Sequence, residues 1–145
     1  MTLKFSCFIT GTDTGVGKTL VTGALLHALT RAGLQTCGMK PVAAGVERIN
    51  GEMQNEDVAM LAAESSIMLP REITTPYLLR EAAAPHIAAR MEQVQMEPAH
   101  LMHCYEQVAQ QSEAVVVEGV GGFRVPLTDA FDTADFAIES PVLLL

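Results

Sequence analysis

Aromatic and basic residues are both scarce in this 145-residue chain, which has no Trp and only 5% aromatic residues. Single-stranded nucleic acids are commonly held on stacked aromatic side chains, so the composition argues against such a platform. The 9 Lys and Arg residues stand against 17 Asp and Glu, which gives a net charge of −8. Bulk positive charge for nucleic-acid binding is therefore lacking, and any bound polyanion must be held by a local site.

Cysteine is also rare, and the spacing of the three cysteines is not that of a metal site. The residues Cys7, Cys37 and Cys104 form no C-x-x-C pair, so neither a zinc ribbon nor a disulfide framework is predicted. No apolar run approaches the roughly 18 residues of a membrane span. The apolar segment 5–10 is too short for a secretory signal. We expect a cytoplasmic protein with no membrane or nucleic-acid partner.

The 49% apolar residues are enough for a folded core, and their pattern alternates between strands and helices. Strands are predicted at 4–10, 35–40, 114–118 and 141–145. Helices are predicted at 18–32, 56–64, 86–91, 98–111 and 133–139, with the apolar face of the first at Val21, Ala24, Leu25, Ala28 and Leu29. Residues 41–55 are expected to be a loop, and residues 69–85 are broken by prolines. The pattern predicts one α/β domain over residues 1–145, with a parallel sheet flanked by helices on both faces.

The segment 141–145 (PVLLL) has the composition of a buried strand at the end of the chain. Domains rarely stop inside a hydrophobic strand, because chain termini usually lie exposed. We therefore expect the domain to be incomplete and to lack further strands and helices after Leu145.

A phosphate-binding loop is predicted after the first strand. Residues 11–19 (GTDTGVGKT) lie between a strand and a helix, and the loop is one residue longer than the strict motif. Glycines let backbone N–H groups face phosphate oxygens, and Lys18 can reach the β- and γ-phosphates. The Thr19 hydroxyl is a suitable oxygen ligand for Mg²⁺.

A second candidate is Glu118, which ends the apolar run 114–117 as the acid of a Walker-B element does. Gly119, Gly121 and Gly122 follow it and allow close approach of a ligand. On residue type alone, Lys40 at a strand end is expected to be a solvated loop lysine. Asp57 at a helix start is likewise expected only to compensate the helix dipole.

Three motifs together resemble the dethiobiotin synthetases of the P-loop NTPase superfamily. They are GTDTGVGKT at 11–19, KPVAAG at 40–45 and VEGVGG at 117–122. The resemblance implies ring closure of 7,8-diaminopelargonic acid with CO₂ and Mg-ATP in biotin synthesis, by a homodimer. It also reverses the expectations for Lys40 and Asp57, which become functional residues.

The resemblance assigns a role to each candidate residue. Lys18, Lys40 and Thr14 are implied to be catalytic, and Thr14, Lys40 and Ala44 to contact the substrate. The implied Mg²⁺ ligands are Thr19, Asp57 and Glu118. The residues implied to contact ATP are Gly15, Val16, Gly17, Lys18, Thr19, Leu20, Asp57, Glu118, Gly119, Val120 and Gly121.

One position departs from the family pattern, and two other functions compete. Ala44 stands where many family members carry Ser or Thr, so a hydroxyl that could bond the substrate is missing. One alternative is a partitioning-type switch ATPase, which usually carries an additional Lys near the loop start, where this chain has residues 11–14 (GTDT). The other is a non-catalytic regulatory domain, against which Lys18, Thr19, Lys40 and Glu118 argue.

Overall fold

A four-stranded parallel sheet forms the centre of the computed structural model, which describes residues 2–140 and 143–144. Its order is β2-β7-β1-β8, with β1 at Phe5–Ile9, β2 at Thr36–Met39, β7 at Ala114–Glu118 and β8 at Leu143–Leu144. The strand predicted at 141–145 is present as β8, which pairs with β1. Its other residues, Pro141, Val142 and Leu145, lie outside the described residues.

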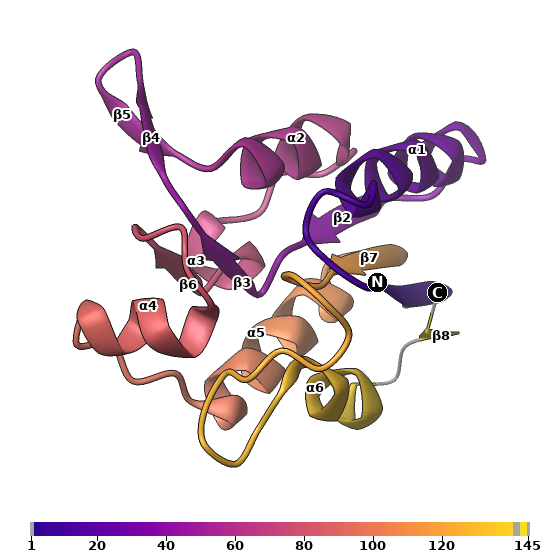
Figure 1. Cartoon of the computed structure of the whole chain (residues 1–145). Coiled ribbons are helices and arrows are strands. Elements are labelled where there is room, and N and C mark those ends of the chain that lie inside the picture. Colours follow the sequence, from indigo (N-terminus) through magenta and orange to yellow (C-terminus); the bar gives the residue numbers. More distant parts are fainter. Residues whose placement is uncertain (1, 141–142, 145) are drawn as a thin grey trace.

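Side chains that alternate along the strands form two cores on opposite faces of the sheet. Phe8 and Val117 pack on one face with α5 (Pro98–Gln110) and α6 (Thr133–Glu139). Ile9 and Val116 pack on the other with α1 (Lys18–Arg31) and α2 (Glu56–Glu64). Figure 1 shows these helix pairs on either side of the sheet. The predicted α/β architecture with helices on both faces is confirmed.

The prediction of a loop over residues 41–55 is wrong, because three short strands lie there. β3 (Val42–Ala44) pairs in parallel with β6 (Tyr77–Leu79). β4 (Glu47–Ile49) and β5 (Glu52–Gln54) form an antiparallel hairpin that projects from the body (Figure 1). Asn50 and Gly51 both have positive φ in its turn, as a type I′ hairpin requires. The proline-broken segment 69–85 holds α3 (Arg71–Thr74) and β6, and α4 (Pro85–Met91) begins at its last proline.

The predicted inward face of α1 is wrong at three of its five residues, because only Leu25 and Leu29 pack against the core. Val21 is 54% exposed and Ala24 and Ala28 are exposed, whereas Thr22, Gly23 and Leu26 are buried. The reason is the close approach of α2, since a Cβ at Gly23 would lie only 2.9 Å from the Met60 sulfur. Thr22, Gly23 and Leu26 therefore face the neighbouring elements, and part of the apolar surface of α1 faces outward.

The three cysteines lie in the interior of the described structure. All three thiols are free and buried, and none forms a disulfide in the described part of the chain. Among the described residues, no helix is both long enough and apolar enough to cross a membrane.

Candidate functional site

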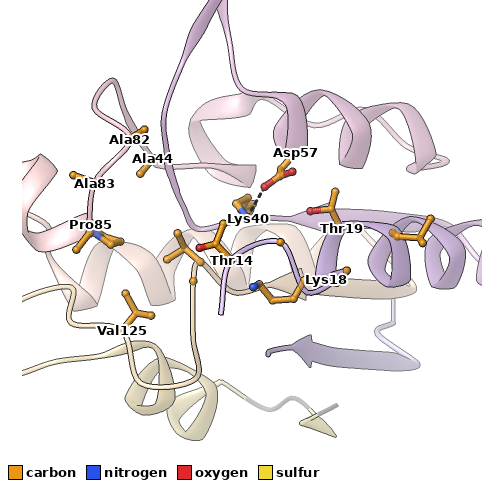
Figure 2. A pocket seen from close by; sticks show the side chains of 16 residues that line it. Thr14, Lys18, Thr19, Lys40, Ala44, Asp57, Ala82, Ala83, Pro85 and Val125 are labelled. Atoms are coloured by element: carbon orange, nitrogen blue, oxygen red, sulfur yellow. Dashed lines mark ion pairs between the residues drawn. The ribbon is translucent and has the colours of Figure 1, made fainter. Parts of the chain in front are cut away.

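The carboxyl ends of β1, β2 and β7 meet at one edge of the sheet. Ile9 pairs with Glu118 and Met39 pairs with Val117, so Lys40, the next residue after β2, lies beside Glu118. A cavity of about 690 Å³ opens at this edge (Figure 2). Its lining residues are Thr14, Gly15, Gly17, Lys18, Thr19, Leu20, Lys40, Ala44, Asp57, Ala82, Ala83, Ala84, Pro85, Val120, Gly121 and Val125.

The loop between β1 and α1 leaves the first turn of the helix open to an anion. Gly15 and Gly17 have φ values of 76° and 105°, which residues with a Cβ atom rarely adopt. Gly17 is the N-cap of α1, and the described structure places no capping side chain and no acid in that first turn. The first N–H groups of the helix and its dipole therefore remain available for negative charge.

Lys18 bends back over this loop and is largely buried. Its Nζ donates to the Asp13 carbonyl oxygen at 2.7 Å, and the residue is 8% exposed. Burial lowers the Lys18 pKa, and the nearby Lys40 ammonium lowers it further. Two cationic side chains thus face the same cavity, where they can neutralise a concentrated negative charge.

Lys40 is the centre of a buried ion cluster, so the expectation of a solvated loop lysine is wrong. Its Nζ lies 2.6 Å from Glu118 Oε2 and 3.1 Å from Asp57 Oδ2. It also donates to the Gly119 carbonyl oxygen at 3.4 Å. Glu118 has no exposed surface, and its second oxygen lies 3.3 Å from Thr22 Oγ1. Asp57 on α2 is the solvent-facing member, with its side chain 39% exposed.

The oxygen atoms at this edge form a donor set that suits Mg²⁺. Asp57 and Glu118 already converge on one cation, the Lys40 ammonium, and the Thr19 side chain lines the same cavity. Mg²⁺ prefers oxygen ligands and commonly uses one or two carboxylates together with substrate phosphates. The residues present therefore fit that ion.

Most of the predicted site residues share the cavity, and three do not line it. Val16 is 53% exposed, and Glu118 is fully buried in contact with Lys40. Gly119 packs into the sheet, where its N–H donates to the Ile9 carbonyl at 2.9 Å.

Sequence reasoning did not identify the apolar wall formed by residues 82–85 and Val125. Nothing in the composition of these residues signals ligand contact, apart from a proline at a helix start.

Comparisons with known proteins identify a matching family and two similar proteins. The model of the AAA domain family matches residues 6–145. The chain is 52% identical over 151 aligned residues to the ATP-dependent dethiobiotin synthetase BioD of Janthinobacterium sp. (strain Marseille). It is 51% identical over 147 residues to the protein of the same name from Aromatoleum aromaticum (strain DSM 19018 / LMG 30748 / EbN1). All of the chain is covered in both comparisons, and it spans 64% and 65% of the length of these relatives.

Proposed function

This chain belongs to the AAA domain family, and we propose that it carries the phosphate- and metal-binding part of an ATP-dependent dethiobiotin synthetase. The observation that supports this most is the convergence of Lys18, Lys40 and Asp57 on one cavity beside the phosphate loop. The names of the two relatives point to the same activity. The order and spacing of the three sequence motifs agree with it.

The proposed reaction joins CO₂ to 7,8-diaminopelargonic acid in three steps. One amine of the substrate adds to CO₂ and loses a proton, which gives a carbamate. A carbamate oxygen attacks the γ-phosphorus of ATP, and ADP leaves. The second amine then attacks the carbamate carbon, and phosphate leaves as the ureido ring closes. Two anions must meet in the middle step, so charge neutralisation and in-line positioning are the main needs.

The residues of this chain can meet those needs. We assign the β- and γ-phosphates to Lys18 and the N–H groups that begin α1, including those of the loop residues Gly15 to Thr19. Thr19, Asp57 and Glu118 would hold Mg²⁺, which when bound supplies neutralising charge at the phosphate oxygens. Lys40 would neutralise the carbamate and the moving phosphoryl group.

The remaining predicted contacts follow from the same placement. Thr14 would face the reacting groups, and Leu20, Val120 and Gly121 would border the nucleotide. Ala44 offers only a methyl group on the substrate side, where backbone groups or water would have to supply any hydrogen bond. The apolar wall at residues 82–85 is suited to the hydrocarbon chain of the substrate. A cytoplasmic homodimer, as the resemblance implies, is part of this proposal.

The test is ADP release that depends on both diaminopelargonate and bicarbonate, measured on the protein expressed from its complete reading frame. We expect Lys40→Ala to lower kcat and kcat/KM together while ATP affinity changes less, because its charge acts mainly during the reaction. Gel filtration of the same preparation tests the homodimer. ADP release that ignores diaminopelargonate would refute the proposed function, and normal turnover of Lys40→Ala would refute the role of that lysine.

A further inference from the structure

The Lys40 ammonium separates the Glu118 carboxylate from the cavity. Lys40 and Asp57 line the cavity, whereas Glu118 is fully buried with its Oε2 only 2.6 Å from the ammonium. Figure 2 shows the Lys40 side chain next to Asp57 at the cavity wall, joined to it by the marked ion pair. A ligand in the cavity therefore meets the ammonium before it can meet Glu118.

Oxygen atoms surround the Lys40 ammonium in the way that oxygen ligands surround a bound metal ion. An ammonium group has three N–H donors, and three oxygens lie around this one, from Glu118, Asp57 and the Gly119 carbonyl. Two of these three oxygens are anionic. Two neighbouring negative charges repel each other, and the ammonium between the two carboxylates offsets that repulsion.

We propose that Lys40 fills the divalent-cation site of the nucleotide-free protein, so that metal enters only together with the nucleotide and displaces the ammonium toward the cavity. This proposal rests on the proposed function for the assignment of Asp57 and Glu118 as metal ligands. It adds an order of events, in which the arrival of Mg-ATP exposes Glu118 and releases the Lys40 charge.

The physical reason is competition for the same oxygens. Mg²⁺ needs oxygens at about 2.0–2.1 Å in nearly octahedral geometry. One carboxylate oxygen of Asp57 and one of Glu118 are already bound to the ammonium. A dication placed against that ammonium would also be repelled by it. The phosphates of a nucleotide change the balance, because they bring metal and give Lys40 a new anionic partner. The cavity that Lys40 lines, of about 690 Å³, has room for the displaced ammonium.

The experiment titrates Mn²⁺ alone, without nucleotide, into the protein from the complete reading frame and counts free Mn²⁺ by electron paramagnetic resonance. We expect weak binding to the wild type and binding tighter by roughly ten-fold or more to Lys40→Met, because the competing charge is gone. The matched control is Lys18→Met, which removes the other ammonium of the cavity and should produce at most a small gain. The double variant Lys40→Met with Glu118→Gln should lose the gain.

Several outcomes would overturn the proposal. Equal Mn²⁺ affinity of wild type and Lys40→Met would do so, since the ammonium would then not compete. If Lys18→Met raised the Mn²⁺ affinity as much as Lys40→Met does, the gain would come from the loss of any positive charge in the cavity and not from the freed carboxylate oxygens. A gain that survives Glu118→Gln would place the metal elsewhere.

A second measurement on the wild type keeps the proposal testable if Lys40→Met does not fold. Mg²⁺ alone should leave the melting temperature unchanged, and Mg²⁺ with ATP should raise it, because only ligands that bind the folded state stabilise it. Stabilisation by Mg²⁺ alone would contradict the proposal. Neither readout requires the biotin-pathway substrate, so a failure of diaminopelargonate-dependent ADP release would refute the proposed function without deciding this inference.

Discussion

Removal of one partner from the ion pair between Lys40 and Glu118 is expected to destabilise the fold strongly, in contrast to the same change in a surface ion pair of similar length. Lys40→Met would leave the Glu118 carboxylate with no exposed surface and without the ammonium that contacts it. Removing one partner of a buried pair typically costs about 3–5 kcal/mol of unfolding free energy. Glu118→Gln should cost less, because Lys40 keeps the Asp57 carboxylate at 3.1 Å.

A double-mutant cycle isolates the interaction itself. Once Lys40 is Met, the further change Glu118→Gln removes an unpaired buried charge, so the double variant should be more stable than the sum of the single effects predicts. We expect a coupling of about 1.5–3 kcal/mol, the range of hydrogen bonds to charged groups. The assay is urea unfolding of all four proteins followed by circular dichroism.

The chain offers a matched control at Lys4 and Glu113. Their side chains are 2.7 Å apart, almost the distance in the buried pair, but Lys4 is 59% exposed. Solvent and salt screen such exposed pairs, so the same cycle there should give a much smaller coupling that fades at high salt. A coupling at Lys40 and Glu118 no larger than this control would refute the reasoning that burial determines the strength of the pair.

Three further predictions concern the phosphate loop, the thiols and a helix cap. Lys18→Ala should weaken Mg-ATP binding by about 1.5–3 kcal/mol in calorimetric titration, because it removes a charge-assisted contact; unchanged affinity would contradict the phosphate-loop assignment. Burial raises the pKa of Cys7 to about 11 and that of Cys37 to about 12. Since about a thousandth or less of each thiol is then ionised near pH 8, both should resist iodoacetamide until urea unfolds the chain, and rapid native labelling would show otherwise. Asp132 accepts from the Asp135 N–H as N-cap of α6, which lowers its pKa. Asp132→Ala should therefore cost about 1 kcal/mol at neutral pH. That contribution is present above the ordinary Asp pKa and lost as pH falls through the lowered one, so equal stability of variant and wild type at neutral pH would exclude it.

The parts of the fold and site that could be predicted from the sequence are those whose signal is local. The phosphate loop is continuous in the chain, because strand, glycines and helix follow one another over residues 5–31. Glu118 could likewise be found at the end of its own apolar strand. The hairpin around Asn50 and Gly51 also had a local signal, the Asn-Gly pair, which the prediction of a loop did not use.

The parts that could not be predicted depend on contacts between distant segments. The buried face of α1 is determined by its approach to α2, which the apolar spacing of α1 alone does not contain. The wall at residues 82–85 becomes part of the cavity only because α4 and the segment before it lie across from the phosphate loop (Figure 2). Alanines carry no chemical signal for such a role.

The position of Lys40 depends both on its local place at a strand end and on a contact with a distant segment, so its residue type alone was misleading. Lysine at a strand end is usually solvated, but the register of β2 against β7 places this one beside a fully buried carboxylate. An unpaired buried charge is costly, so Lys40 has a structural role in compensating Glu118, apart from any reaction. A loss of turnover in Lys40→Ala would therefore mix a catalytic effect with the loss of the ion cluster. The stability cycle and the Mn²⁺ titration separate the two, because both measure the cluster without the reaction.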